Sequence, residues 1–451
     1  MANVIKLRKG LDIQLVGEAE KFEIKLIPNG KYALMPSCFP GLTPKVVVRK
    51  GERVKAGDAL FVNKNHPEVK FASPVSGIIT AIERGERRKV LSVQVKADAE
   101  LIYQDFGKKS DISLLTDDDV KNTLLEAGLF GYINQLPYAV SAIPSDKPKA
   151  IFVSALRDKP LASNFEYELE GQEDDFQTGL TALSKMAKTY LGIGVNQQAQ
   201  ALLNAKNVDI YIFDGPCPAG NVGVQINHIS PINKGEVVWT VDPTVVIFIG
   251  RLFNTGKVDL RRKVAFVGSE VRKPCYVTML VGQELTTLLS NSLNHEQHIR
   301  IINGNVLTGT PTSKDGYLGA HSSEITVIPE GDNADEFAGW IMPRFNQYSV
   351  SRSYFSWLFG KKKKYILDAR IKGGERHMIM SGEYDKVIPM DIYPEYLIKA
   401  IIAGDIDKME QLGIYEISPE DFALAEFVDS SKLELQRIVR QGLDMLRKEN
   451  E

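Results

Sequence analysis

Between residues 150 and 255, apolar runs of strand length alternate with a segment of helical periodicity, and this alternation restricts the fold more than any other feature. The runs at 150–155, 208–213 and 245–249 are apolar apart from Ser154 and Asp209, as in strands that are buried on both faces. The segment 172–190 instead carries apolar residues at helical spacing. Because strands that alternate with helices form parallel sheets, we predict a Rossmann-like α/β domain over residues 112–257, with a capped helix at 112–128.

Residues 1–100 have an all-β pattern. Short β-branched runs are separated by Gly/Asp turns, and the stretches "VRKGERVKAGDALF" and "ASPVSGIITAI" resemble the biotinyl/lipoyl barrel-sandwich hybrid. Carriers of that family hold their cofactor on a lysine at a hairpin tip, and the loop at 63–70 has neither a Met-Lys-Met nor an Asp-Lys-Ala tip. We expect a scaffold without a swinging arm; a biotin or lipoate carrier is an alternative.

The remainder of the chain falls into three parts. Strand patterns at 263–268, 276–280 and 321–328 with a helix at about 282–294 indicate a ubiquitin-like, SLBB-type β-grasp over 260–330. Residues 331–375 form a connecting segment, and 376–451 a C-terminal helical domain. The expected helix boundaries there are Pro394 in a first turn, Gly404 after a last turn, a cap at 418–421, and a capping box of Ser431 and Glu434.

Composition excludes several classes of protein. The chain has 451 residues and a net charge of −2, so no global basic field exists to bind nucleic acid. Its three cysteines, Cys38, Cys217 and Cys275, are far apart, which favours a reducing compartment over a disulfide framework. An iron–sulfur cluster usually needs four thiolates, so this chain is not expected to hold one alone.

The longest apolar runs are too short for a transmembrane segment. The run at 245–249 is the densest, whereas a spanning helix needs about 20 apolar residues. The N-terminus also lacks the apolar stretch of a signal peptide. We therefore expect a chain that does not cross a membrane, although it could lie against one.

Tests for catalytic, cofactor and metal motifs are negative, and we predict none of these sites in the chain. No glycine follows the run at 150–155, where a dinucleotide-binding turn would need G-x-G-x-x-G. The stretch 304–310 has P-loop glycine spacing without the lysine. His295 and His298 are three residues apart rather than four, so we interpret them as a solvated helix end rather than a metal site.

Two stretches of the sequence each allow a structural and a functional interpretation. The Pro/Gly loop at 214–220 directly follows a buried strand, where α/β proteins often bind ligands, or it is a structural turn. The stretch 357–365 places aromatic residues beside the lysine run Lys361–Lys364. It is either an exposed loop or a contact with anionic lipid or a partner.

Several long segments in sequence order resemble the A subunit of the Na⁺-translocating NADH:quinone reductase. They cover nearly the whole chain: "KGLDIQLVG", "VKFASPVSGIITAIERGERR", "FDGPCPAGNVG", "RIINGNVLTG", "FAGWIMPRFNQYSVSRS" and "GEYDKVIPMDI". Related subunits of Rnf complexes and of respiratory complex I bind flavin and NADH with a glycine-rich loop. The matching stretch here, 127–138, has lost most loop glycines, and the relatives' cluster cysteines and the flavinylation motif of sister subunits are missing.

The resemblance implies a cofactor-free chain in a complex that oxidises NADH, reduces quinone and exports Na⁺. FAD, a 2Fe–2S cluster, FMN and riboflavin would belong to partner subunits. The chain would sit peripherally on the cytoplasmic face of the bacterial inner membrane, docked on the membrane-embedded B subunit. The alternative is a flavin- and NADH-binding subunit of an Rnf-like complex. The resemblance also suggests quinone-proximal residues, for which core packing is the other explanation: Leu34, Met35, Pro36, Phe39, Leu136, Pro137 and Tyr138.

Overall fold

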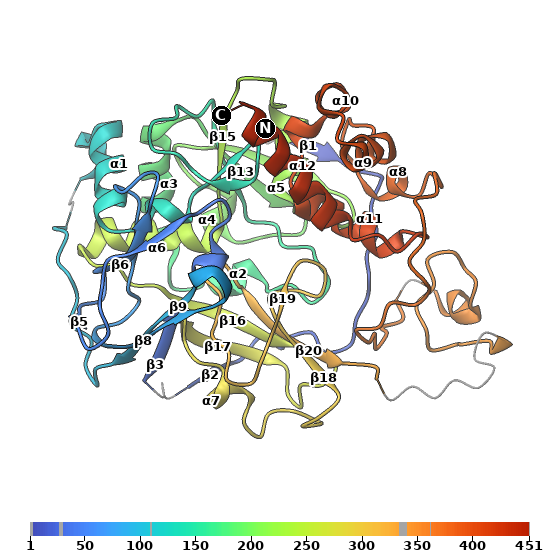
Figure 1. Ribbon diagram of the computed structural model, residues 1–451, viewed down its shortest axis with the longest axis horizontal. Coiled ribbons are helices and arrows are strands. Elements are labelled where there is room, and N and C mark those ends of the chain that lie inside the picture. Colours follow the sequence, from blue (N-terminus) through green and yellow to red (C-terminus); the bar gives the residue numbers. More distant parts are fainter. Residues whose placement is uncertain (1–2, 27–29, 109–110, 333–340, 361, 451) are drawn as a thin grey trace.

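A seven-stranded mixed sheet forms the centre of the protein (Figure 1). The computed structural model describes residues 3–26, 30–108, 111–332, 341–360 and 362–450. The strand order is β1–β14–β13–β12–β15–β10–β11; β10 is antiparallel to both of its neighbours, β15 and β11, and the other neighbouring pairs are parallel. The strands are β1 (Asn3–Lys6), β10 (Asn134–Leu136), β11 (Val140–Ser141), β12 (Ile151–Ser154), β13 (Thr189–Gly194), β14 (Asp209–Asp214) and β15 (Val238–Val241).

Helices cover both faces of this sheet. Side chains alternate along a strand, so Ile151 and Val153 of β12 pack in the core cluster that contains α3 (Glu173–Met186), while Phe152 packs in a second cluster with Ile226. Ile226 belongs to α5 (Val222–Ile229), which contacts β12. A strand buried on both faces explains why the run at 150–155 is apolar without alternation.

The run at 245–249 was expected to be a strand and is instead part of helix α6 (Pro243–Thr255). Asp242 caps the helix by accepting a 2.9 Å hydrogen bond from the Thr244 amide, Pro243 occupies the first turn, and Gly256 ends it with a φ of 72°. The helix lies against α3 and is buried on almost every side. Because the helix is buried on all sides, it has no polar face, and the helical periodicity of apolar residues that would identify it in the sequence is absent.

Two other helices of this region are present but shorter than expected. The capping box of Thr116 and Asp119 opens α1 (Asp117–Glu126), and Gly128 follows with a φ of 69°. The first residues of the expected helix form a separate turn, η3 (Ile112–Leu114). The helix expected at 172–190 ends at Met186, and Tyr190 lies in β13.

The first hundred residues form a barrel-sandwich of two small sheets, but not all of them belong to it. One sheet has the order β3–β9–β8–β5 and the other β4–β6–β7. Gly51 and Gly57 have φ angles of 86° and 101°, as their turns require. The strands are β3 (Lys31–Leu34), β4 (Pro44–Val46), β5 (Arg53–Val54), β6 (Ala59–Asn63), β7 (Lys70–Ala72), β8 (Gly77–Arg84) and β9 (Val90–Ala97), with turns η1 (Pro36–Cys38) and η2 (Glu86–Arg88).

The residues that precede this barrel-sandwich join other sheets. Strand β1 pairs with β14 in the central sheet, and β2 (Glu23–Lys25) pairs with β17 (Cys275–Leu280). Their backbone partners lie hundreds of residues away, so sequence periodicity carries no signal for the pairing. The expected unit 1–100 therefore includes about 25 residues that tie the other two sheets together.

A six-stranded mixed sheet, β19–β18–β20–β16–β17–β2, holds most of the expected 260–330 region. The helix expected at about 282–294 is wrong beyond one turn, since only α7 (Thr286–Leu289) is helical. Leu285 and Leu293 are buried, but no side chain caps α7 and Asn291 has a φ of 59°, which stops a helix. The other strands are β16 (Arg261–Val267), β18 (Ile299–Asn303), β19 (Thr310–Thr312) and β20 (Glu324–Pro329).

The C-terminal region is helical. Pro394 and Gly404 bound one helix as expected, and Ser418 with Asp421 forms a capping box. The expected box of Ser431 and Glu434 is wrong, because the Ser431 hydroxyl accepts a hydrogen bond from the Ile379 amide and Asp429 accepts from the amides of Ser431 and Leu433. The helices are α8 (Tyr384–Val387), α9 (Pro394–Ala403), α10 (Ile406–Gln411), α11 (Ala423–Val428) and α12 (Leu435–Asn450), with turns η7 (Ile414–Glu416) and η8 (Pro419–Phe422).

Within the described part of the chain, none of the helices has the length and apolarity needed to cross a membrane. The connecting segment expected at 331–375 contains turn η6 (Phe355–Phe359). Residues 333–340 and Lys361, which belong to that segment and to the lysine run, lie outside the described residues.

Candidate functional site at the switch point of the central sheet

A cavity of about 720 Å³ lies where strands β12 and β15 end. The chain proceeds from β12 to β13 on one side and returns to β15 on the other, so these two strands flank the point at which the strand order reverses. Open α/β sheets bind ligands in this position. Residues from every part of the fold line the cavity: 35, 37–38 and 134; 154, 156–159, 162 and 220–222; 240–243, 303–305 and 308–312; 319, 321–324 and 420.

A buried ion network supports one wall of the cavity. One Arg157 Nη1 atom donates to Glu168 Oε2 and to Ser163 Oγ, both at 2.6 Å, and Nη2 donates to Thr244 Oγ1 at 2.8 Å. The Glu168 side chain is completely buried. Arg262, also buried, donates to the same Thr244 hydroxyl and to Ser323. The charges of Arg157 and Glu168 thus neutralise each other, as desolvation requires, and Arg262 is held by hydroxyl groups.

The network sets the protonation of its neighbours. Burial opposes ionisation of Asp242, but the guanidinium groups of Arg157 and Arg262 outweigh it, so the pKa of Asp242 lies below its usual value. Burial lowers the pKa of His321 to about 4, which keeps its imidazole neutral near pH 7. Burial raises the pKa values of Asp158 and Glu324. A cavity with few free charges results.

Several buried polar atoms of the lining have no hydrogen-bond partner among the described residues. They are Asn134 Oδ1, Asn221 Oδ1 and His321 Nε2. Buried polar groups of this kind normally meet water or a ligand. Two acceptor oxygens and an imidazole suit a small polar group better than an apolar one.

The cavity suits a nucleotide or flavin phosphate poorly. Lys159 forms a 2.9 Å ion pair with Glu420, and Arg157 is held by Glu168 and Asp242, so both cations of the lining are already paired. Four carboxylates also line the cavity: Asp158, Asp242, Glu324 and Glu420. An entering phosphate would displace carboxylates rather than meet open cations and backbone amides.

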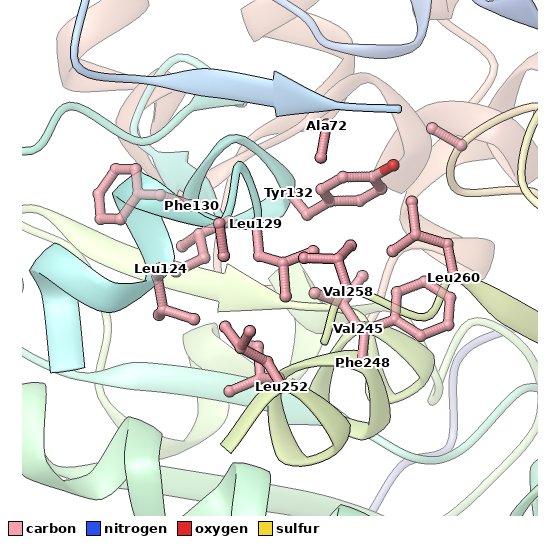
Figure 2. Packing of buried hydrophobic residues seen from close by; sticks show 14 of the residues in the cluster. Ala72, Leu124, Leu129, Phe130, Tyr132, Val245, Phe248, Leu252, Val258 and Leu260 are labelled. Carbon is pink, nitrogen blue, oxygen red and sulfur yellow. The ribbon is translucent and has the colours of Figure 1, made fainter. Parts of the chain in front are cut away.

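Large side chains fill the stretch 127–138, where related proteins carry a glycine-rich loop. This stretch forms η4 (Phe130–Tyr132) and β10, and the side chains of Phe130 and Tyr132 are fully buried. Figure 2 shows Leu129 and Tyr132 packed toward Val245 and Phe248 of α6. The Phe130 ring meets Trp239 at 5.4 Å and the Tyr132 ring meets Phe39 at 5.1 Å between centroids. A flavin ring would need this volume.

Comparison with known proteins gives the family. Residues 5–98 match the NqrA N-terminal barrel-sandwich hybrid domain, 115–258 the NqrA second alpha/beta domain, and 263–314 the NQRA C-terminal domain. The A subunit of the Na⁺-translocating NADH-quinone reductase from Yersinia pestis bv. Antiqua (strain Angola) is 34% identical over 99% of this chain and 100% of its own. The Haemophilus influenzae (strain PittGG) A subunit is 35% identical with the same coverage.

The chain belongs to this family of A subunits. A solved NAD⁺-reducing NiFe hydrogenase overlaps 67% of this chain and 55% of its own, with a TM-score of 0.34 and 12% identity, too loosely to inform the site. The expected family is therefore confirmed, as are a barrel-sandwich hybrid, an α/β domain and a C-terminal SLBB domain.

The two stretches expected near quinone meet at the backbone but point to different places. The Ser141 amide donates to the Pro40 carbonyl at 2.9 Å, which brings them together. Of the seven expected residues only Met35 lines the cavity; Leu34, Pro36 and Phe39 are buried behind it. The second stretch packs elsewhere: Leu136 lies in the cluster around Phe152, and the Tyr138 hydroxyl accepts a 3.2 Å hydrogen bond from Asn450.

The remaining motifs have structural contacts. In the 214–220 loop the Cys217 amide donates to Asp12 and the Gly220 amide to Asp158, as in a structural turn. Gly220 also lines the cavity, and ligand binding by this loop stays a prediction. His295 pairs with Glu270 at 2.6 Å and His298 with Asp332 at 2.8 Å, from loops rather than a helix. The described residues contain no cluster of three or more side chains placed to hold a metal.

Sequence reasoning missed Arg157, Glu168, Asp242 and His321. A signal for the first was present, because three charged residues, 157–159, directly follow a buried strand. Charges at the carboxyl end of a parallel strand are expected at a switch-point site. Asp242 was hidden by the wrong assignment of 245–249, since a helix there makes it an N-cap.

Proposed function

We propose that this chain is the cofactor-free peripheral subunit of a Na⁺-translocating NADH:quinone reductase, docked at the cytoplasmic face on the membrane-embedded B subunit. The complex named for its relatives would couple NADH oxidation and quinone reduction to Na⁺ export, with the flavins and the 2Fe–2S cluster in partner subunits. Family membership over the full length of both chains supports the subunit role.

The absence of a cofactor is supported chiefly by the packing of residues 127–138. Gly131 is one glycine left there, and a Cβ at this position would lie 2.4 Å from the Phe71 ring. Phe130, Tyr132 and Ile133 are fully buried around it. We infer that the α/β domain is Rossmann-like and that the six-stranded sheet contains a ubiquitin-like module. Both would keep the fold of a redox subunit, while side chains occupy the volume that a cofactor would need.

Absorption spectroscopy of the purified full-length chain tests this proposal. We expect no flavin absorption band in the visible region and no flavin released by acid denaturation. The intact mass should equal the mass of the sequence, without biotin or lipoate. Stoichiometric flavin, or quenching of tryptophan fluorescence by NADH at micromolar concentration, would support the flavoprotein alternative instead.

Docking on the B subunit is tested by affinity purification of a tagged chain from detergent-solubilised membranes. The B subunit is expected to co-purify even from cells that lack the other subunits. Retention only when a different subunit is present would contradict this placement.

A quinone contact, the finer part of the proposal, is assigned to the Leu34–Phe39 side. Met35 and Cys38 line the cavity, and the unpartnered His321 Nε2 and Asn134 Oδ1 lie in the same lining. A wall formed by a thioether and a thiol, beside an imidazole nitrogen that can donate a hydrogen bond to a carbonyl oxygen, suits a quinone ring. Leu136, Pro137 and Tyr138 would support this wall only through the shared backbone contact at Pro40.

Replacing Met35 by Trp in the assembled complex tests this contact. Because the larger ring would fill the cavity edge, we expect the KM for quinone to rise several-fold while NADH oxidation by an artificial acceptor is unchanged. Met445→Trp, on the exposed face of α12, is the matched control. An unaltered quinone KM in Met35→Trp would remove the contact but leave the subunit role intact.

A further inference from the structure

The segment 341–366 has a charge composition unlike the rest of the chain. It contains six lysines and arginines and not one aspartate or glutamate, whereas the whole chain has a net charge of −2. Arg344 and Arg352 lie in its first half and the lysine run at its end. A block of one sign creates a local field that selects an anionic partner.

The same segment exposes large apolar side chains. Soluble proteins commonly leave single apolar residues exposed, but a contiguous group indicates a contact surface. Leu358 is 61% exposed and Trp357 47% exposed, and neither lies in a neighbouring core. The exposed apolar residues of the segment are Ile341, Met342, Phe345, Val350, Phe355, Trp357, Leu358, Phe359 and Ile366.

Aromatic rings and cations alternate within this surface. The Phe345 ring lies 6.0 Å from Phe355 and 6.1 Å from Phe359. Lys363 Nζ lies 4.2 Å from the Phe359 centroid, and the Arg352 guanidinium lies 5.9 Å from that of Trp357. Cations therefore border the exposed rings, as they do in proteins that rest at the headgroup level of a bilayer.

The surface is fixed to the body of the protein at one end. Tyr365 is buried; its amide donates to the Gln14 carbonyl at 2.9 Å, and its carbonyl accepts from the Val16 amide at 3.0 Å. Its hydroxyl donates to the Ser356 carbonyl, which holds turn η6 in place. Lys364 pairs with Glu18 at 2.9 Å. In Figure 1 this orange segment projects at the side of the molecule, so its exposed face is accessible to a large flat partner.

We propose that residues 341–366 bind the surface of a bilayer that contains anionic phospholipids. This inference rests on the proposed function only in that a membrane complex places the chain beside a bilayer. An acidic protein would also meet the charge, but the grouping of Trp and Phe with Leu, Ile and Met beside lysines favours the interface between headgroups and acyl chains. Binding would add a second attachment to that made through a membrane-embedded partner.

Vesicle co-sedimentation of the purified full-length chain tests the proposal. We expect binding to phosphatidylcholine vesicles that contain phosphatidylglycerol, little binding to phosphatidylcholine alone, and weakening by salt. Lys362→Ser with Lys363→Ser should weaken binding by about tenfold or more, since each basic residue near an anionic surface contributes about fivefold in affinity. Lys45→Ser with Lys50→Ser, which removes the same charge from the exposed barrel-sandwich, should not.

A fluorescence measurement assigns the contact to the aromatic surface. Trp357 emission should shift to the blue on anionic vesicles, and the Trp357→Phe variant should bind while losing that shift. Equal binding to both vesicle types, equal loss in both lysine pairs, or binding only to vesicles that carry the B subunit would overturn the lipid inference. In the last case the surface fits a protein partner, and the subunit role stands.

Discussion

The switch-point cavity and the 341–366 segment handle charge in opposite ways. In the cavity, Arg157 is 11% exposed and bonded to Glu168, whose side chain has no exposed surface. In the segment, Arg352 and Lys363 lie over aromatic rings at the surface, with no acidic residue in the segment itself. The buried charges of the cavity are balanced by other residues of the chain, whereas the positive charge of the segment favours an anionic partner outside the chain.

This difference separates stability from attachment. A buried ion pair that loses one partner leaves an uncompensated charge in a poorly solvated site, which is strongly destabilising. An exposed cation or ring that is removed leaves water in its place, which costs the fold little. Variants in the cavity should therefore unfold the protein more easily, whereas variants in the segment should leave the fold unchanged and weaken its contacts.

The largest effect is expected for Arg157→Met. Glu168 would then stay buried without its cation, and unfolding should become easier by about 3–5 kcal/mol. Urea unfolding followed through the buried Trp239 measures this. The control is Arg300→Met, which breaks a half-exposed pair with Glu330 and should cost at most about 1 kcal/mol. Equal losses would show that the buried network is not special.

A second variant tests the packing beneath the cavity, Gly250→Ala in α6. A Cβ there would lie 1.7 Å from the Asp175 carbonyl oxygen of α3, so the two helices must separate. We expect a loss of about 1–3 kcal/mol in the free energy of unfolding. Gly374→Ala is the control in the connecting segment, because its Cβ would meet no atom within 4 Å. A neutral Gly250→Ala would contradict the close approach.

A third prediction concerns pH and His321. The folded pKa is about 4, below the usual 6.5, so between these values the unfolded chain binds one more proton than the folded chain. This contribution to stability is therefore full above about pH 6.5 and is lost as the pH falls toward 4. The gap in unfolding free energy between wild type and His321→Gln should narrow by about 1–2 kcal/mol from pH 7 to pH 5.5. A gap that is constant with pH would mean a solvated, normally titrating imidazole.

Local patterns of the sequence were sufficient wherever the structure depends on neighbours in the chain. The capping box of Thr116 and Asp119 and the helix limits at Pro394 and Gly404 are confirmed because each is set within a few residues. The prediction of a strand at 245–249 was wrong, because strands and helices that are buried on all sides have the same apolar composition. The prediction that Ser431 caps the last helix was wrong, because its hydroxyl accepts a hydrogen bond from the distant amide of Ile379.

The cavity was less predictable than the fold. Its position follows from the order in which strands pair, and its charges come from segments as far apart as Arg157 and Glu420. Contacts between segments so far apart in the chain leave no periodic pattern in the sequence. The loss of loop glycines in 127–138 could be read directly, but only the structure shows that Phe130 and Tyr132 turn into the core rather than toward solvent.

The smallest effect on stability is expected for Leu358→Ser, and this sharpens the comparison most. The side chain is 61% exposed, so its removal should change the free energy of unfolding by less than about 0.5 kcal/mol. Leu397→Ser is the matched control, because that leucine is fully buried in the C-terminal core and should cost several kcal/mol, about the range for deleting a buried leucine. Sedimentation with phosphatidylglycerol vesicles should rank the two variants in the reverse order, with weaker binding for Leu358→Ser. A large loss of stability in Leu358→Ser would mean that the segment contributes to the stability of the fold. Its exposed side chains would then not serve only to bind a partner surface.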